Sequence, residues 1–173
     1  MANYQAHRSF GTISSIQIEA QGGPGKRTFR LFLESGVASA CLWLEKEQLQ
    51  QLAIYIKEIG EALSGEADEG GEGSPESPWS GEAISLEFKV GDLSMGHDDA
   101  SNSFIFLARD VESDDDSSVD LSFWVPLNMA RELSKEALSV CAAGRPRCFL
   151  CNQPINPEGH MCVRSNGHQT FQS

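Results

Sequence analysis

Alternating hydrophobic and polar residues mark two groups of three strands along the chain. The period is two residues, because successive side chains of a strand point to opposite faces of a sheet. The strand-like runs are Phe10–Glu19, Arg27–Glu34 and Val37–Leu44 in the first group, and Ile84–Val90, Phe104–Ala108 and Val119–Val125 in the second. A continuation of the run from Ile84 to Met95 is the alternative for its end. The sequence thus predicts six strands in two sets.

Each set of strands is followed by apolar residues at three- and four-residue steps, the spacing of one helical face. These helices are expected at Lys46–Leu63 and Leu127–Ala142. The strand-to-helix junctions Leu42–Glu45 and Phe123–Pro126 align with each other, and a helix tolerates proline in its first turn. The sequence therefore predicts an α+β fold whose mostly antiparallel sheet is built from two similar β-β-β-α halves. Chance similarity of two such junctions is the alternative to a duplication.

A polar segment separates the two halves. Residues 65–78 contain five acidic residues, four glycines and no base. Because this composition cannot bury apolar surface, we expect an acidic Gly/Ser/Pro linker. The expected organisation is a first half over residues 1–64, the linker over 65–80, a second half over 81–143 and a tail over 144–173. Trp79 at the end of the linker is expected to dock on the body or on a partner.

Composition and charge exclude several classes of protein. Hydrophobic residues make up 40% of the 173 residues, and no apolar run is long enough to span a membrane. The first residues lack the apolar stretch of a secretory signal, so we expect a cytoplasmic protein. The net charge is −12, and residues 1–143 carry ten basic against 24 acidic side chains. This acidic body argues against binding to nucleic acid or to anionic lipid.

The tail carries the strongest chemical motif of the chain. Cys148, Cys151, His160 and Cys162 are spaced C-x2-C-x8-H-x-C. Three thiolates and one imidazole fill a tetrahedral Zn²⁺ site and leave no open position. The motif therefore predicts a structural zinc that staples a tail too short to have its own core. Catalysis or recognition by the metal is the alternative.

The same tail resembles a known family. The run from Gly144 to Gly167 reads G-R-P-R-C-x-L-C-x-x-P-x-x-P-E-G-H-x-C-x-R-x-N-G and is similar to the C-terminal signature of an uncharacterised bacterial family, domain of unknown function 3090. Gly22–Phe29 and Phe88–Gly91 resemble its N-terminal and central motifs. The chain departs from the usual pattern at Asn156 and Val163, neither of which is a predicted ligand. The resemblance covers essentially the whole chain and implies no established activity.

Other segments offer weaker sites. Gly23, Gly25, Lys26 and Arg27 could hold a phosphate or another anion through backbone N–H groups and two cations, although a plain glycine-rich turn is favoured. His97 precedes two aspartates and could act as a general base, although a polar turn is favoured. The tail also holds a set of three cations that could contact nucleic acid phosphates: Arg145, Arg147 and Arg164.

Trp43 and Trp124 stand at equivalent strand ends. Core positions are expected for both, with the lining of a groove between the halves as the alternative.

The leading interpretation is a non-enzymatic binding or adaptor module whose partner is another protein. The alternative is an enzyme or binder of a phosphorylated or anionic small molecule, acting through the loop from Gly22 to Arg27. Nucleic-acid binding by the basic zinc tail comes third, because the body is acidic.

Overall fold

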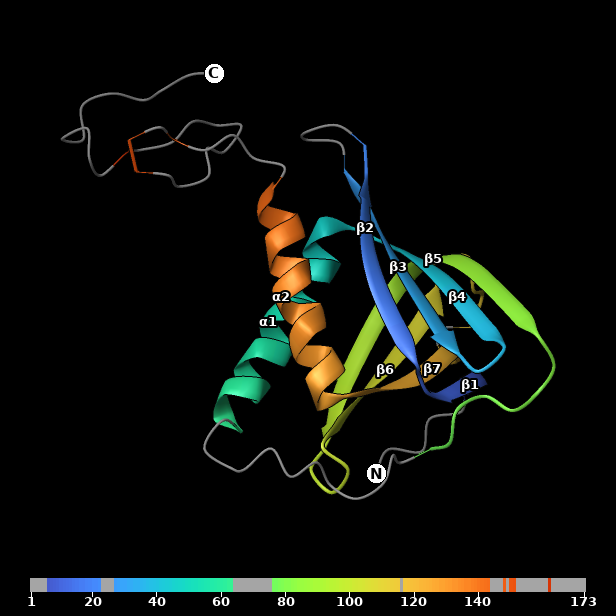
Figure 1. Cartoon of the computed structure of the whole chain (residues 1–173). Coiled ribbons are helices and arrows are strands. Elements are labelled where there is room, and N and C mark those ends of the chain that lie inside the picture. The colour runs from blue at the N-terminus through green and yellow to red at the C-terminus, as the bar shows by residue number, and fades with distance from the viewer. Residues whose placement is uncertain are drawn as a thin grey trace.

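The computed structural model describes residues 6–22, 27–63, 76–115 and 117–143, together with Cys148, Leu150, Cys151 and Cys162. These residues form a curved sheet with two helices beside it (Figure 1). The elements are β1 (Ala6–Thr12), β2 (Ser15–Gln21), β3 (Thr28–Ser35), β4 (Ala38–Leu44), α1 (Lys46–Ala62), β5 (Ile84–Asp98), β6 (Ser103–Asp110), β7 (Val119–Pro126) and α2 (Leu127–Ala143). Four of the six strand pairings are antiparallel, so the predicted α+β class is confirmed.

The sequence-based prediction of one strand at Phe10–Glu19 is wrong, because this run forms both β1 and β2. Two residues between them change the pairing partner of the chain. The Ile13 amide donates to the Trp124 carbonyl on β7 (3.0 Å), and the Ser14 amide donates to the Glu34 carbonyl on β3 (2.8 Å). The strand order is β1-β7-β6-β5-β4-β3-β2, so this junction joins the two ends of the sheet. The sheet therefore closes on itself.

The two halves use the same pairing scheme. β5 pairs in parallel with β4 over its first part and antiparallel with β6 over its second part. β1 and β2 together do the same, since β1 pairs in parallel with β7 and β2 pairs antiparallel with β3. Each half ends in a 17-residue helix. The prediction of two similar β-β-β-α halves is confirmed.

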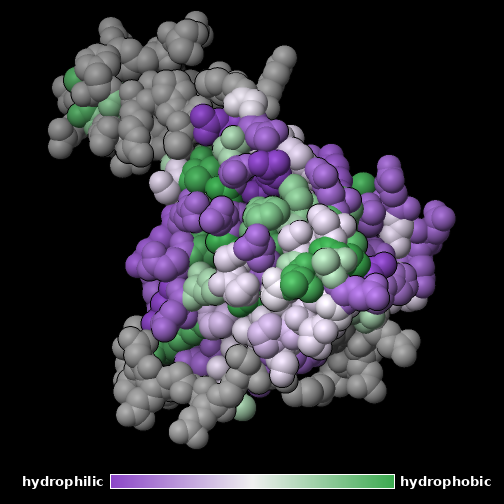
Figure 2. All heavy atoms as spheres, turned by 45° about the vertical axis from the view of Figure 1, so that its right-hand side comes forward, coloured by the Kyte–Doolittle hydropathy of each residue, from purple (hydrophilic) through white to green (hydrophobic). Residues whose placement is uncertain are grey.

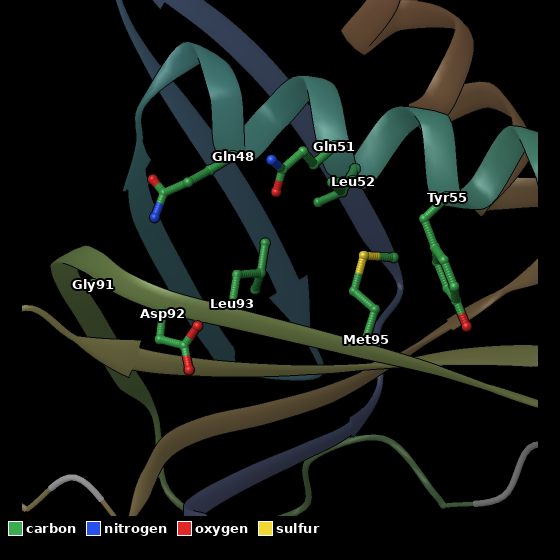
Figure 3. Close-up of a pocket in the computed structure, with 8 residues that line it drawn as sticks. All are labelled: Gln48, Gln51, Leu52, Tyr55, Gly91, Asp92, Leu93 and Met95. Atoms are coloured by element: carbon green, nitrogen blue, oxygen red, sulfur yellow. The ribbon is translucent and has the colours of Figure 1, made fainter.

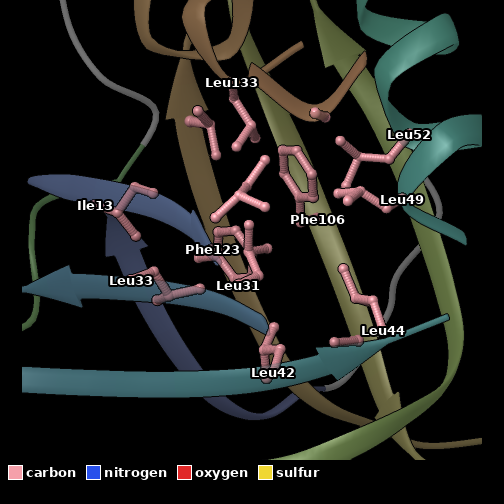
Figure 4. Close-up of a cluster of buried hydrophobic side chains, with 14 of the residues drawn as sticks. Ile13, Leu31, Leu33, Leu42, Leu44, Leu49, Leu52, Phe106, Phe123 and Leu133 are labelled. Atoms are coloured by element: carbon pink, nitrogen blue, oxygen red, sulfur yellow. The ribbon is translucent and has the colours of Figure 1, made fainter. Parts of the chain in front are cut away.

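The core lies between the inner face of the sheet and the two helices (Figure 4). Phe106 and Phe123 are completely buried at its centre, with their rings stacked 5.0 Å apart. The helices cross where the Ser134 hydroxyl donates to the Ala53 carbonyl (2.7 Å). Ser134 and Ala53 hold the same position in their helices. The contact between the helices therefore joins equivalent residues of the two halves.

Residues 76–82, which include the end of the expected linker, lie against the body. The Trp79 ring packs on Phe10 (5.7 Å between centroids), and the Trp79 amide donates to the Ser35 hydroxyl (3.0 Å). The Thr12 hydroxyl donates to the Glu76 carbonyl (2.6 Å). Gly36 has a positive φ, and a Cβ there would meet the Trp79 carbonyl oxygen at 2.4 Å, so only glycine fits. Trp79 thus docks on the body.

Trp43 and Trp124 do not lie in the core, contrary to expectation. Both are half-buried, because the residues on either side of them in β4 and β7 take the inward positions. The Trp43 indole donates to the Glu87 carboxylate (2.9 Å), and the Arg30 guanidinium lies over its ring. No helix in the described part of the chain is long and apolar enough to cross a membrane.

Candidate metal centre

Three of the cysteines predicted as metal ligands converge in the structure. The Sγ atoms of Cys148, Cys151 and Cys162 all lie within 4.8 Å of one another. A tetrahedral zinc ion with Zn–S bonds of about 2.3 Å places its sulfur ligands roughly 3.8 Å apart. The three sulfur atoms therefore lie at a separation that one ion can bridge with small shifts.

These cysteines are not buried by packing into the main hydrophobic core. Cys148 and Cys162 are buried and Cys151 is half-buried, yet none of the three belongs to the main hydrophobic cluster. They follow α2 in the chain. None of the five cysteines, all of which are described, forms a disulfide. The centre is thus a second buried cluster, made of sulfur rather than hydrocarbon.

Backbone amides stabilise the thiolate form of Cys148, the first of these cysteines. The N–H groups of Cys151 and Leu150 donate to the sulfur of Cys148, which favours its thiolate form. Together with the thiols of Cys162 and Cys151, and against the effect of burial, they lower the pKa of Cys148 to about 7. Two amides can reach one sulfur because Leu150 and Cys151 lie in a turn shortly after Cys148. A thiolate is the form that binds a metal.

The donor set fits a soft ion. Three thiolates select zinc or another thiophilic metal over magnesium or calcium. His160, the fourth predicted ligand, lies outside the described residues. The structure therefore brings together every cysteine of the predicted site.

The other predicted site residues divide in two groups. Gly23, Gly25 and Lys26 of the anion loop, and Arg145, Arg147 and Arg164 of the tail, lie outside the described residues. Arg27 is described and half-buried, and its Nε has no hydrogen-bond partner among the described residues.

His97 lies near the end of β5, in the hairpin that β5 forms with β6. Its Nε2 lies 3.2 Å from the Asn102 side-chain oxygen, and its Nδ1 lies 3.2 Å from the Asp99 carboxylate. Its ring packs against Phe104 at 5.0 Å. Residues 99–102 form the turn between β5 and β6. His97 and Asp98 are the last residues of β5, so only Asp99 of the predicted polar turn lies in the turn itself.

One feature had no signal in the sequence. A groove of about 370 Å³ separates α1 from β5 (Figure 3). It is lined by Gln48, Gln51, Leu52, Tyr55, Gly91, Asp92, Leu93 and Met95. On α1 the groove is lined partly by polar residues next to the apolar stripe, such as Gln48 and Gln51. Polar residues on a helix usually indicate exposure to solvent, so the sequence could not reveal that they face a strand.

The comparisons with known proteins agree with the motif in the tail. Comparison with curated proteins and with solved structures gives no match. A family model described as "Protein of unknown function (DUF3090)" matches residues 8–162, which include β2 to β7, both helices and the three clustered cysteines. Since this match spans most of the 173 residues, the chain belongs to the DUF3090 family.

Proposed function

We propose that this protein is a non-enzymatic binding module whose tail is folded around one structural zinc ion. Cys148, Cys151 and Cys162 would hold the ion, with His160 as the fourth ligand. The observation that carries the proposal is the convergence of the three Sγ atoms within 4.8 Å. The two amides directed at Cys148 support it, because they stabilise a thiolate before any metal arrives.

A complete Cys₃His set has a structural role in most proteins. Its four ligands saturate the tetrahedral ion and leave no site for a water or substrate. Binding then contributes directly to the folding of the surrounding segment. Reduced thiolates of this kind persist in the cytoplasm, which is the compartment we propose.

The chemistry of the described body favours binding over catalysis. Its two histidines are engaged by carboxylates or an amide: His7 by Asp120, and His97 by Asp99 and Asn102. Neither histidine has a serine or cysteine side chain as a hydrogen-bond partner among the described residues, as an activated nucleophile would require. Among the described residues, this arrangement supports a protein that recognises a partner.

The described surface favours a local binding site over a broad apolar one. Figure 2 shows hydrophobic residues as separate areas among hydrophilic ones on the visible face. Among the described residues, the large hydrophobic residues that are exposed are Val37, Ile54 and Val111, and they lie on three different elements or turns. Wide apolar faces mark obligate interfaces, whereas scattered residues are normal on monomers. We therefore place recognition in a groove or in the metal-bound tail.

The test combines metal analysis with partner capture on the same samples. Tagged wild-type chain should carry one zinc and retain a partner through purification. Cys148→Ser should lose the zinc, because one thiolate of the site is missing, and with it the partner binding that the tail contributes. Cys41→Ser is the matched control, since Cys41 is a free thiol on β4 outside the cluster, and it should keep both.

Two outcomes would contradict the proposal. Wild-type chain without zinc would remove its metal centre. A zinc-free Cys148→Ser chain that retains the partner would remove the tail from the recognition surface.

A further inference from the structure

The groove between α1 and β5 has a closed counterpart in the other half of the molecule. Leu42 and Phe123 each stand four residues before the first residue of a helix. The row Ile18–Leu31–Leu42 across β2, β3 and β4 therefore corresponds to the row Met95–Phe106–Phe123 across β5, β6 and β7. Met95 in the groove is thus the equivalent of Ile18.

The two equivalent positions differ in burial. Ile18 is 7% exposed, and α2 packs closely against β2 above it. Met95 is only half-buried, and α1 makes no comparable contact with β5. Leu93 and Met95 point from β5 toward α1 across the open space (Figure 3).

A ring contact of Tyr55 spans the space between α1 and the sheet. The Tyr55 ring meets the Phe104 ring edge-on, with 6.2 Å between their centroids. The equivalent residue on α2 is Glu136, which has no ring to act as a spacer. The groove is therefore present between α1 and β5 and has no open equivalent between α2 and β2.

The floor of the groove is an open strand edge. β4 pairs with β5 only as far as Lys89, because the chain then turns into α1. Gln48 at the start of α1 takes the next backbone group, donating to the Val90 carbonyl (3.1 Å). From Gly91 onward, no described strand pairs with this edge of β5, whose other edge pairs with β6. An open edge beside apolar pockets is the usual template for an added peptide strand.

The charge of the groove selects its occupant. Asp92 is the charged residue among those lining the groove; it alternates with Leu93 and points to the outer side of β5, where Arg109 on β6 is its register partner (Figure 3). It is exposed and has no ion pair among the described residues. Glu58 follows one turn after Tyr55 on α1 and is also exposed. The surrounding body carries an excess of acids. This field attracts cations and repels acidic or phosphorylated ligands.

We propose that this groove binds a short, extended, basic segment of a partner protein as an additional strand on β5. The backbone of the segment pairs with the open edge from Gly91 onward. One apolar side chain fills the space between Leu52, Leu93 and Met95, and a lysine or arginine lies near Asp92. This inference rests on the proposed binding function and assigns the chemistry of the partner.

The test measures the binding of labelled peptides to the full zinc-loaded chain by fluorescence anisotropy. The probe is a short peptide of alternating lysine and valine. One comparison peptide has glutamate in place of lysine, and another has the same side chains but N-methylated amides. We expect the lysine peptide to bind at least tenfold more tightly than either, because only it supplies both the charge and the edge hydrogen bonds.

Variants of both halves provide matched controls. Asp92→Lys reverses the charge of the groove, and Gln51→Trp fills it from the exposed face of α1; each should weaken binding at least tenfold. Glu136→Lys makes the same charge change on α2, and Glu132→Trp adds the same ring at the position equivalent to Gln51. Both controls should bind within about twofold of wild type, and all four variants should retain zinc.

Several results would overturn the inference. These are failure of the lysine peptide to bind, equal binding of the glutamate or N-methylated peptide, and equal loss in the α2 controls. A wild-type dimer that Asp92→Lys converts to monomer would assign the groove to a second copy instead. If the groove variants retain a captured partner that Cys148→Ser loses, the proposed function stands and the groove assignment fails.

Discussion

The α+β body and the cysteine centre both bury sulfur, but for different reasons. Cys141 on α2 is buried among the hydrocarbon side chains of the main cluster. Cys148 and Cys162 are equally buried but lie outside that cluster, facing each other and Cys151. A free thiol in a core acts as a small hydrophobe, whereas converging thiols form a ligand set.

The body and the cysteine centre are therefore stabilised by two different kinds of interaction. The body depends on apolar area removed from water, and the centre on coordination of an ion. Each region should therefore respond to a perturbation that leaves the other unchanged. The predictions below test that separation, beginning with the largest effect.

Metal removal should unfold the tail around the local turn of Leu150 and Cys151, whose amides still reach the Cys148 sulfur, and leave the body intact. Structural zinc contributes on the order of 10–16 kcal/mol to the folding of small zinc-finger peptides. Chelation should therefore expose the segment after Ala143 to protease, while the urea midpoint of the body stays unchanged. Proteolysis followed by mass spectrometry checks the first effect, and circular dichroism the second. A body that unfolds with the chelator would show that the two regions are one cooperative unit.

A core substitution should have the opposite pattern. Phe106→Ala removes a completely buried ring that stacks on Phe123, which should cost the body about 3–5 kcal/mol. Urea unfolding measures this loss, and metal analysis of the folded fraction should still find one zinc per chain. Loss of zinc from folded Phe106→Ala chain would contradict the separation.

Removal of one buried hydrogen bond should give a smaller effect on the body alone. Ser134→Ala deletes the hydroxyl that donates to the Ala53 carbonyl between the helices. The expected cost is about 1 kcal/mol, because that carbonyl belongs to the interior of α1 and keeps its helical partner. The Lys135→Ala variant, on the exposed neighbouring position, is the control and should change stability by less than about 0.5 kcal/mol.

The ionisation of cysteines should also differ between the metal centre and the body. The amides of Cys151 and Leu150 lower the pKa of Cys148 from 9.0 to about 7, whereas burial, with Glu87 beside it, raises the pKa of Cys41 on β4. A lowered pKa means that the folded state favours the thiolate. The contribution of Cys148 to stability is therefore complete above pH 9.0 and is lost as the pH falls toward about 7.

Thiolate absorbance of the metal-free chain measures this pattern. A first step should appear near pH 7 and vanish in Cys148→Ser, while Cys41→Ser should affect only the steps above pH 9.0. Persistence of the first step in Cys148→Ser would contradict the assignment of the lowered pKa.

The sequence predicted the local elements of the body because each depends on near neighbours. Period-two alternation identified the strands, and the stripe from Leu49 to Gly60 identified α1 with nearly its observed ends. Closure of the sheet was not predictable, since it depends on Ile13 and Ser14 finding partners on β7 and β3, far away in sequence. The groove was equally hidden, because the ring contact that spans it joins Tyr55 and Phe104, which are also distant in sequence.

The cysteine site was predictable for a chemical reason. Paired thiolates of structural zinc sites typically have C-x2-4-C spacing, so C-x2-C carries information about geometry as well as composition. The positions of Trp43 and Trp124 show the limit of composition alone. A large aromatic residue is often buried, but here the alternation of each strand assigns it to the outward face.

X-ray absorption at the zinc edge tests the central claim most directly, because it counts the ligand atoms around the ion. The account predicts three sulfur atoms at about 2.3 Å and one nitrogen at about 2.0 Å in the purified chain, with the nitrogen lost in His160→Ala. Absence of bound zinc, or a shell of oxygen atoms without sulfur, would contradict the assignment of Cys148, Cys151 and Cys162 as a metal centre.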